Sequence, residues 1–547
     1  MALNLEFNII KESNSKKIKF LYLSPKNKSN FEIFKIVELF LFYLILFLLP
    51  EQILSISYNN YIEIKFNHPG DQQVVSDSFV LSNLHVSQVN NRARSMNGKK
   101  IHIDSNTDTV KLIWENVYVT DFSKMFSNLE NITEVKINNM LGHQNKFYYT
   151  FENCINLQKI TFSIEYSFSY AIKDMRGMFY NCQSLISFSF NNLYLDYYSY
   201  GYEEVCDYFC YTKTVYYHNS ISMSYMFYNC TSLNTIDMYY LANKYVKYVS
   251  DMNHMFYNCI SLKSVYLSMF FTQSDDYIDL SYMFYNCQKL ETITFSSNPQ
   301  SFCVNNMKLM FYNCSSLTSI NLESFQSSYD LNFSYLFYNC HNLKTVELND
   351  NYLHITDTRE MFYNCFKLEK LTFYPQYTMN QINMSRMFYN CYKLNTITFN
   401  KDNNYFVPID MSSMFYNCNS LIGLNLNKFQ TNEVKYMSYM LYNCFQLTNF
   451  NILNTIFENS NIKDMRGIFQ NCQSIVTFNL TNFFTPNVEI MWDMFNGCNK
   501  LTNLIIPNFD TSKVTDMQSM FSGCKNLLSL NLNHFITTKV QYMNEMF

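Results

Sequence analysis

The chain has 547 residues and a formal net charge of −4, so it lacks both the basic excess of nucleic-acid-binding proteins and the acidic excess of charged tails. Nine glycines and eight prolines exclude collagen-like, linker-rich and low-complexity proteins. Its 50 Phe and 46 Tyr supply the apolar surface of a large core.

The N-terminal region carries an uninterrupted apolar run at residues 39–49, after seven lysines between Lys11 and Lys35. The run is shorter than the roughly 20 residues that span a bilayer, but it suits the core of a signal peptide. Ser57 offers a small residue for cleavage. We therefore expect residues 1–57 to be an N-terminal tail and hydrophobic leader, either a cleaved signal peptide or a signal anchor. A buried strand and a misassigned start are the alternatives.

A repeat of about 26 residues fills the chain from residue 109 onward. Its most regular part is the string Met-Phe-Tyr-Asn-Cys, as in Met226–Cys230, with relaxed versions such as Met520–Cys524. The repeat cysteines follow one another at 25 to 29 residues, apart from one step of 48: Cys154, Cys182, Cys230, Cys259, Cys287, Cys314, Cys340, Cys365, Cys391, Cys418, Cys444, Cys472, Cys498 and Cys524.

The first half of each unit has the spacing of a short helix. Met175, Met178, Phe179 and Cys182 follow the i, i+3, i+4, i+7 pattern of one helix face. An Asp, Asn or Ser usually precedes this segment and can accept hydrogen bonds from free backbone N–H groups. The residue before each repeat cysteine is Asn or Gly, which both tolerate positive φ, so we expect a left-handed end there.

The second half of each unit reads Leu-x-x-Ile-x-Leu, as in Leu317, Ile320 and Leu322, and predicts a short strand with one buried face. Neither a two-turn helix nor one short strand can bury its apolar face alone, so the units must stack. We therefore predict an α/β repeat fold. It is a leucine-rich-repeat-type solenoid of about 15–16 coils, with a parallel β-sheet on one face and short helices on the other.

The stretch Asn508–Leu532 resembles the 25/26-residue surface-protein repeat of the BspA-like leucine-rich-repeat family, which is familiar from mycoplasma lipoproteins and protozoan surface proteins. The resemblance covers the chain from about Val110 to Phe547. It implies a secreted or surface-displayed solenoid, often linked to adhesion. Residues 58–108 resemble the segment that precedes such repeats in some protozoan members, which implies an N-terminal capping segment.

The 48-residue step places a Tyr-rich insertion at about residues 193–218. Insertions in solenoids project from one face and often bind ligands, and tyrosine suits contact surfaces; the alternative is a hairpin packed on its own coil. Cys206 and Cys210 could form a local disulfide in an oxidising compartment, and the redox state of Cys303 stays open. The tyrosines proposed for binding are Tyr197, Tyr198, Tyr202 and Tyr208.

The chain stops at Phe547, inside a further unit and without the polar cap that a solenoid end needs. We therefore expect the solenoid of residues 109–547 to be truncated at its C-terminus. The missing part would carry further repeats, with or without a stalk or membrane anchor.

The aligned cysteines allow three interpretations. A zinc site needs closely spaced converging thiolates, which a 26-residue period does not give. Disulfides between neighbouring coils would need unfavourable torsions. We therefore favour buried free thiols that act as small apolar side chains. With no metal-binding motif, phosphate-binding loop or paired titratable groups, we predict no cofactor, no metal and no enzymatic activity.

The outward positions of the predicted strands offer hydroxyl and amide groups that could bind ligands, although exposed Thr and Asn also suit a merely solvated sheet. Sequons allow N-glycosylation at Asn131, Asn332, Asn383 and Asn479, whereas those at Asn229 and Asn313 precede a buried cysteine and are treated as incidental. The candidate ligand-face residues are Thr235, Asp237, Thr292, Thr294, Asn321, Thr345, Glu347, Thr396, Thr398 and Asn425.

The leading hypothesis is a cell-surface or secreted recognition and adhesion solenoid that binds proteins or glycans through this polar face and the Tyr-rich insertion. No nucleic-acid partner is expected, and membrane association is expected only through the leader or a missing C-terminal anchor. The alternative is an intracellular or coat scaffold without a specific ligand, which would explain the many unpaired cysteines more easily.

Overall fold

The chain divides into two compact units, Met1–Tyr58 and Asn59–Phe547. The computed structural model describes residues 60–547 of the second unit except 82–83, 85, 115–118, 139–140, 164–171, 190–197, 207–209, 219–220, 239–248, 268–276, 296–301, 324, 328–329, 349–353, 374–378, 400–404 and 452–460. The leader predicted at residues 1–57 lies outside the described residues. Within these residues, no helix is both long and apolar enough to cross a membrane.

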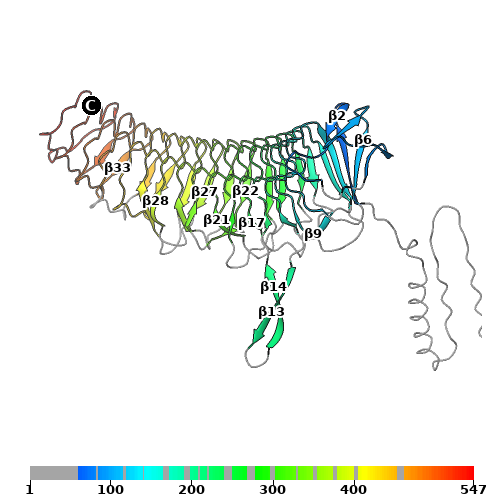
Figure 1. The fold of residues 1–547 in the computed structure, drawn as a ribbon. Coiled ribbons are helices and arrows are strands. Elements are labelled where there is room, and N and C mark those ends of the chain that lie inside the picture. Colours follow the sequence, from blue (N-terminus) through cyan, green and yellow to red (C-terminus); the bar gives the residue numbers. More distant parts are fainter. Residues whose placement is uncertain are drawn as a thin grey trace, which may run out of the picture. The chain divides into compact units, whose positions relative to one another are not determined.

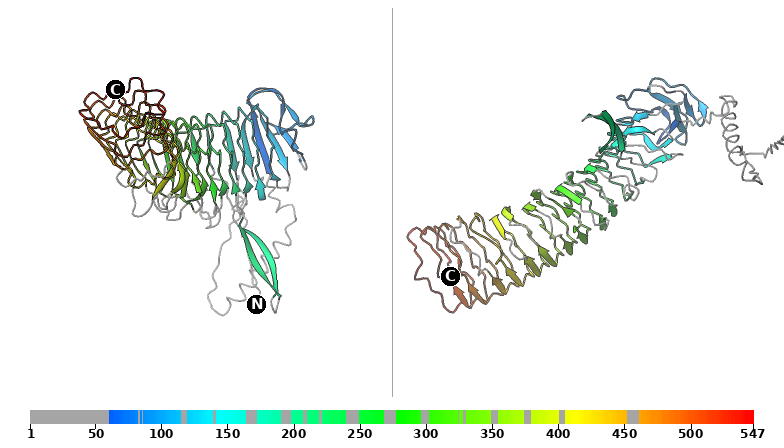
Figure 2. Two further views of the ribbon diagram at one scale, coloured as in Figure 1. Left: turned by 90° about the vertical axis from the view of Figure 1, so that its left-hand side faces the viewer. Right: turned by 90° about the horizontal axis from the view of Figure 1, so that it is seen from below.

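The described repeats form a β-solenoid whose coils carry strands before and after a run of tight turns (Figures 1 and 2). After Asp410 the strands before the turns give way to isolated parallel bridges, such as Ile490 with Asp516. We call the strands before the turns the first row and those after the turns the second row. Both rows pair in parallel, coil upon coil. The predicted parallel sheet is therefore present as the second row, and the first row is an additional sheet.

The first row consists of an eight-stranded and a four-stranded sheet. Its strands in chain order are β7 (Val119–Asp121), β9 (Leu141–Lys146), β11 (Ile172–Asp174), β15 (Ile221–Ser222), β17 (Val249–Asp251), β19 (Ile278–Asp279), β21 (Phe302–Asn306), β23 (Phe325–Gln326), β24 (Asp330–Asn332), β26 (His354–Asp357), β28 (Met379–Asn383) and β30 (Phe406–Asp410).

The second row begins in the N-terminal sheet and continues through four shorter sheets. Its strands are β8 (Ile132–Asn138), β10 (Lys159–Ser163), β12 (Ser187–Ser189), β16 (Thr235–Asp237), β18 (Ser264–Leu267), β20 (Thr292–Phe295), β22 (Ser319–Asn321), β25 (Thr345–Glu347), β27 (Lys370–Phe373), β29 (Thr396–Phe399), β31 (Gly423–Asn425), β32 (Asn449–Asn451), β33 (Thr477–Asn479) and β34 (Asn503–Ile505).

The predicted short helices are wrong: the described part of the chain contains no helix, and the Met-Phe-Tyr-Asn-Cys segments are successive tight turns. Two residues per segment, four positions apart, have left-handed backbone, as His254 (φ 55°) and Asn258 (φ 60°) show. A right-handed helix cannot contain such residues at that interval. The predicted left-handed Asn before the cysteine is confirmed, but the second left-handed position was missed.

The hydrogen bonds explain why turns form instead. Within one segment, the N–H groups of Met255, Tyr257 and Cys259 donate to carbonyls three residues earlier. The intervening N–H groups of Phe256 and Asn258 donate to carbonyls of the next coil, at 2.8 and 2.7 Å. Alternate N–H groups thus join neighbouring coils, which a helix would not allow because it uses all its N–H groups internally.

Where an Asp or Asn precedes a turn segment, its side chain accepts a hydrogen bond from the backbone N–H two residues later, as the sequence suggested; Tyr436 and Ile490 take this position in two units. The Oδ1 atom of Asp251 accepts from the N–H of Asn253 at 2.9 Å, and Asp410 accepts in the same way from Ser412 at 2.8 Å. This is the Asx-turn geometry that Asp and Asn favour. The acceptors begin a tight turn and not a helix.

The core runs through the stack between the two rows and the turns. In the units up to Cys498 the Met, Phe, Cys and Leu side chains of the repeat are buried, as Met387, Phe388, Cys391 and Leu394 illustrate, whereas Cys524 and Leu527 of the last unit are partly buried. The repeat phenylalanines stack along the solenoid, with ring centroids 5.5 Å apart between Phe362 and Phe388. The predicted shared interior is therefore confirmed.

The N-terminal end of the solenoid is an antiparallel extension of the second row. Strand β1 (Asn60–Phe66) pairs antiparallel with β8 on one side and with β6 (Thr109–Trp114) on the other, and β3 (Val86–Val89) and β4 (Arg92–Ala93) follow. A separate ribbon joins β2 (Gly70–Gln73) to β5 (Lys100–Ile103). Ser76 forms two hydrogen bonds to the first turn segment. Its backbone N–H donates to the carbonyl of Met125 at 2.7 Å, and its hydroxyl donates to the carbonyl of Lys124 at 2.6 Å.

The insertion contains an antiparallel hairpin of β13 (Tyr198–Cys206) and β14 (Cys210–His218), labelled in Figure 1. Its register places Cys206 opposite Cys210.

Candidate ligand-binding face

The predicted ligand-face residues lie on the outward side of the second row. Their strands alternate between buried and exposed positions, so that Ile397 is buried while Thr396 and Thr398 on either side of it are exposed. All ten positions are exposed except Asp237, which is half-buried. They belong to β16, β20, β22, β25, β29 and β31.

Some of these groups bond to one another across neighbouring coils. Asn321 lies beside Glu347 in the parallel register, and its Nδ2 donates to the Glu347 carboxylate at 2.6 Å. Asn321 also accepts, through Oδ1, from the N–H of Glu323 at 2.8 Å. The structure thus holds this pair in a fixed orientation on the face.

Two of the predicted residues line one hollow beside β29 and β31 of the second row. The hollow measures about 730 Å³, and both Thr398 and Asn425 lie in its wall. The remaining lining comes from Ile397, Phe399, Tyr405, Asn427 and Lys428. Tyr405 and Lys428 come from the segments that follow the strands, so the strand periodicity did not reveal them.

The hollow combines an aromatic ring, an ammonium group and short polar side chains. Lys428 places its Nζ atom 5.6 Å from the centre of the Tyr405 ring. The Oδ1 atom of Asn425 accepts from the backbone N–H of Asn427 at 2.9 Å, which fixes the direction of its amide. Such a wall can hydrogen-bond a polar ligand and stack on it.

The hairpin register places two of the four insertion tyrosines. Tyr197 and Tyr208 lie outside the described residues. Tyr198 stands opposite His218 and Tyr202 opposite Thr214 in the hairpin register. Their roles, and the disulfide between Cys206 and Cys210, stay predictions.

The four sequon asparagines differ in surroundings. Asn131 is half-buried and its Nδ2 donates to the Gln72 side chain at 3.1 Å. Asn332 and Asn383 each begin a turn segment, and the serine of each sequon is buried. Asn479 and Thr481 are both exposed, at the end of β33 on the outward side of the second row.

A feature that the sequence analysis missed is a stack of tyrosines along the turns. Neighbouring ring centroids lie 4.4 to 4.7 Å apart with nearly parallel planes. Burial raises the pKa of Tyr257 and of Tyr338 to about 12. The tyrosine in every Met-Phe-Tyr-Asn-Cys string was the available signal. The stack comprises Tyr180, Tyr228, Tyr257, Tyr285, Tyr312, Tyr338, Tyr363, Tyr389, Tyr416 and Tyr442.

The repeat cysteines are free, and those from Cys154 to Cys498 are buried, which confirms the buried-thiol interpretation; Cys524 is half-buried. Each thiol also donates to the phenylalanine or leucine carbonyl of the preceding coil, as Cys391 does to Phe362 at 3.2 Å. Burial raises the pKa of the Cys391 thiol well above its ordinary value. The sequence analysis missed this donor role. No cluster of three or more His, Cys, Asp or Glu that could hold a metal occurs in the described ranges.

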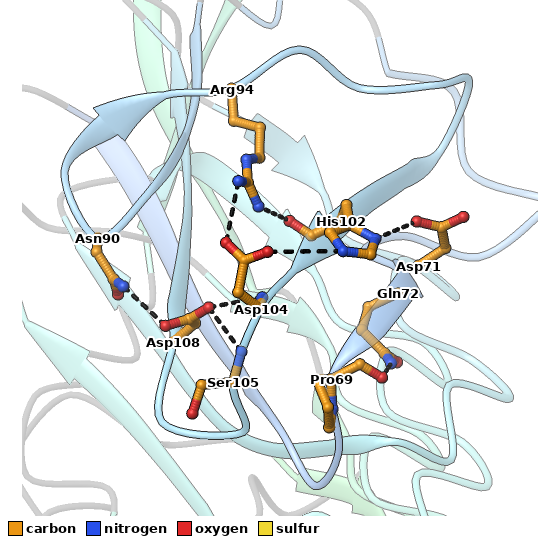
Figure 3. Close-up of polar contacts among 9 residues, drawn as sticks. All are labelled: Pro69, Asp71, Gln72, Asn90, Arg94, His102, Asp104, Ser105 and Asp108. Carbon is orange, nitrogen blue, oxygen red and sulfur yellow. Dashed lines mark hydrogen bonds and ion pairs between the residues drawn. The ribbon is translucent and has the colours of Figure 1, made fainter.

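A polar cluster lies on the ribbon of β2 and β5 and on the turns beside it (Figure 3). His102 faces Asp71 at 2.7 Å and Asp104 at 3.6 Å, while Arg94 bonds Asp104 at 3.0 Å. Asp108 accepts from Asn90 and from two backbone N–H groups, and these bonds lower its pKa. Because these ion pairs are solvent-exposed, we interpret them as ties between strands and turns.

Family models cover most of the repeat region. The model described as "BspA type Leucine rich repeat region" matches in six overlapping copies, at residues 115–204, 148–279, 206–333, 253–384, 307–435 and 333–464. The model described as "Mycoplasma protein of unknown function, DUF285" matches residues 463–547. No curated protein matches the chain.

Several solved structures are similar at low identity. A leucine-rich-repeat protein of T. pallidum is 18% identical over 32% of this chain and 77% of its own, with a TM-score of 0.22. One from Eubacterium ventriosum is 14% identical over 64% and 78%, with a TM-score of 0.29. The plant peptide hormone receptor RGFR1, in complex with RGF2, is 12% identical over 76% and 61%, with a TM-score of 0.25. The repeat matches, together with the two rows of parallel strands, show that the chain belongs to the BspA-type leucine-rich-repeat family.

Proposed function

We propose that this chain is a secreted or cell-surface recognition solenoid that binds proteins or glycans through the outward side of its second row. Leucine-rich-repeat proteins are typically protein-interaction scaffolds. The observation that carries the proposal is the regular exposure of hydroxyl and amide side chains on that side, coil after coil. Because the stack fixes the strands that bear these groups, a ligand could be bound at many points with little ordering cost.

The proposal can be tested by placing charge and bulk on the face. The full chain, secreted from a eukaryotic cell, would be screened against glycan and extracellular-protein arrays. For each ligand found, the double variant Thr345→Arg and Thr396→Arg should weaken binding at least tenfold. Both threonines are exposed, so the fold should tolerate the change. Gln288→Arg, an exposed change after a turn segment, is the matched control. Equal effects of the two changes would refute the face as the binding surface.

The alternative is a structural scaffold inside the cell or in a coat. It is favoured by the free thiols of the described cysteines, since secreted proteins commonly oxidise theirs. The exposed sequon at Asn479 separates the two, because only passage through the secretory pathway would add a glycan there. A shift in mass that disappears in the variant Asn479→Gln supports secretion. An unmodified chain found in the cytosol would support the scaffold.

A further inference from the structure

We propose that the hollow lined by Thr398, Tyr405, Asn425 and Lys428 is a subsite for a carboxylated sugar, such as a sialic acid or a uronic acid at the end of a glycan. This inference rests on the proposed function and names the ligand class for one place on the face. The hollow, of about 730 Å³, lies within the range of small-ligand sites.

Among the residues that the structure describes, the wall of the hollow offers donors, the unpartnered Oδ1 acceptor of Asn427, and no carboxylate. The Thr398 hydroxyl and the Nδ2 of Asn425 have no hydrogen-bond partner among the residues that the structure describes. Lys428 likewise forms no ion pair within the described parts of the chain. The described lining residues include no Asp or Glu. Such a set favours a ligand that is rich in oxygen acceptors and negatively charged.

The aromatic side of the hollow favours a sugar over a flexible acidic peptide. Tyr405 is 37% exposed, so part of its ring can contact a ligand, and Phe399 closes the wall beside it. A sugar ring has an apolar C–H side that packs on such a surface, while its hydroxyls meet the short polar groups of Thr398 and Asn425. The ligand carboxylate then pairs with the Lys428 ammonium.

The half-buried position of Lys428 strengthens this pairing. Its ammonium lies 5.6 Å from the Tyr405 ring centre, so the side chain is already oriented toward the hollow's aromatic wall. A charge held in a partly desolvated place binds an anion more strongly than one on a flexible surface lysine. A neutral sugar would lose this contribution.

The test is direct binding of sialyllactose and of glucuronate oligosaccharides to the full chain, with lactose and carboxyl-reduced oligosaccharides as neutral counterparts. We expect the carboxylated sugars to bind at least about tenfold more tightly. Lys428→Gln should remove that preference, and Tyr405→Leu should weaken both kinds of sugar. The matched controls are Lys263→Gln and Tyr266→Leu, exposed residues elsewhere along the second row, and they should leave binding unchanged.

Three results would overturn the inference: equal binding of carboxylated and neutral sugars, equal effects of Lys428→Gln and Lys263→Gln, or binding of a Glu-rich peptide in place of the sugars. Circular dichroism of each variant confirms that it has folded. If the carboxylated sugars do not bind, but the double variant Thr345→Arg and Thr396→Arg no longer binds another ligand, the proposed function stands and only this subsite is refuted. If the carboxylated sugars bind and depend on Lys428 while the arginine variant retains every other ligand, the subsite stands and binding along the rest of the face is refuted.

Discussion

Replacing one buried repeat cysteine should measure what a single thiol contributes to the solenoid. We choose Cys391→Ala, because Cys391 is fully buried and its Sγ atom lies 3.2 Å from the carbonyl oxygen of Phe362 in the preceding coil. Alanine removes the sulfur without disturbing the backbone of the turn. The loss is therefore confined to one heavy atom and one S–H donor.

The magnitude follows from these two losses. Removing one buried heavy atom from a close-packed interior costs about 1 kcal/mol in transfer free energy, with a further contribution from the cavity. The Phe362 carbonyl keeps its bond from the N–H of Cys365, at 3.1 Å, so losing the thiol adds only about 0.5 kcal/mol. We expect the free energy of unfolding to fall by about 1–2 kcal/mol.

The assay is urea unfolding followed by circular dichroism and by tyrosine fluorescence, with the midpoint compared under equal conditions. Cys524→Ala is the matched control, because Cys524 occupies the same repeat position but is half-buried. It should cost less. If Cys391→Ala costs nothing, or if the two variants cost the same, the thiols do not stabilise the stack in the way described.

Four further predictions follow from the stacked coils. The repeat cysteines from Cys154 to Cys498 should resist thiol reagents in the folded protein and react after unfolding, because they are buried and burial raises the thiol pKa, as it does for Cys230 and Cys391. Asn417→Ala should destabilise by about 1–2 kcal/mol, because Asn417 has φ 60° and two inter-coil side-chain bonds, whereas Asn417→Gly should cost less. The pKa of Tyr257 and of Tyr338 is raised to about 12, above the unfolded value of 10.0. The stability that these phenols contribute should therefore be complete below pH 10 and be lost as the pH rises toward 12. A phenolate absorbance titration, measured beside a pH series of unfolding curves, checks this, and titration of these phenols at an unshifted pKa would contradict it. We also propose that residues 58–108 cap the solenoid, so their deletion should lower the unfolding midpoint and increase aggregation, and an unchanged midpoint would refute the cap.

The sequence predicted what depends on periodicity within one unit. The buried Met, Phe, Cys and Leu positions, the second-row strand and the left-handed Asn are all visible in a single repeat. The helix was wrong because the same i, i+3, i+4, i+7 spacing also fits a coil of tight turns, in which His254 and Asn258 both have positive φ. Only bonds between coils distinguish the two, and those bonds are not encoded in the spacing.

The first row and the hollow were missed for related reasons. Alternating residues such as Ile278, Asp279 and Leu280 gave a strand signal that was too short to separate from the start of a helix. Of the hollow, the sequence located Thr398 and Asn425 by strand alternation but not Tyr405 or Lys428. Those two come from the segments that follow the second-row strands, whose positions depend on how neighbouring coils pack.

The bonds between coils run in a fixed pattern: in the turn segments the N–H groups of each coil donate to carbonyls of the next coil, as Phe256 does to Met283, whereas after the cysteine they donate back to the preceding coil, as Ser316 does to Gln288. Each side of a coil therefore carries donors and acceptors in an order that repeats from coil to coil. Any coil can consequently follow any other, so the gene could gain or lose whole units by recombination without creating a mismatched joint. The turn carbonyls of the first coil have no preceding coil, and Ser76 bonds two of them. Length is thus the property of this protein that evolution can change most readily, and the length of the proposed binding surface changes with it.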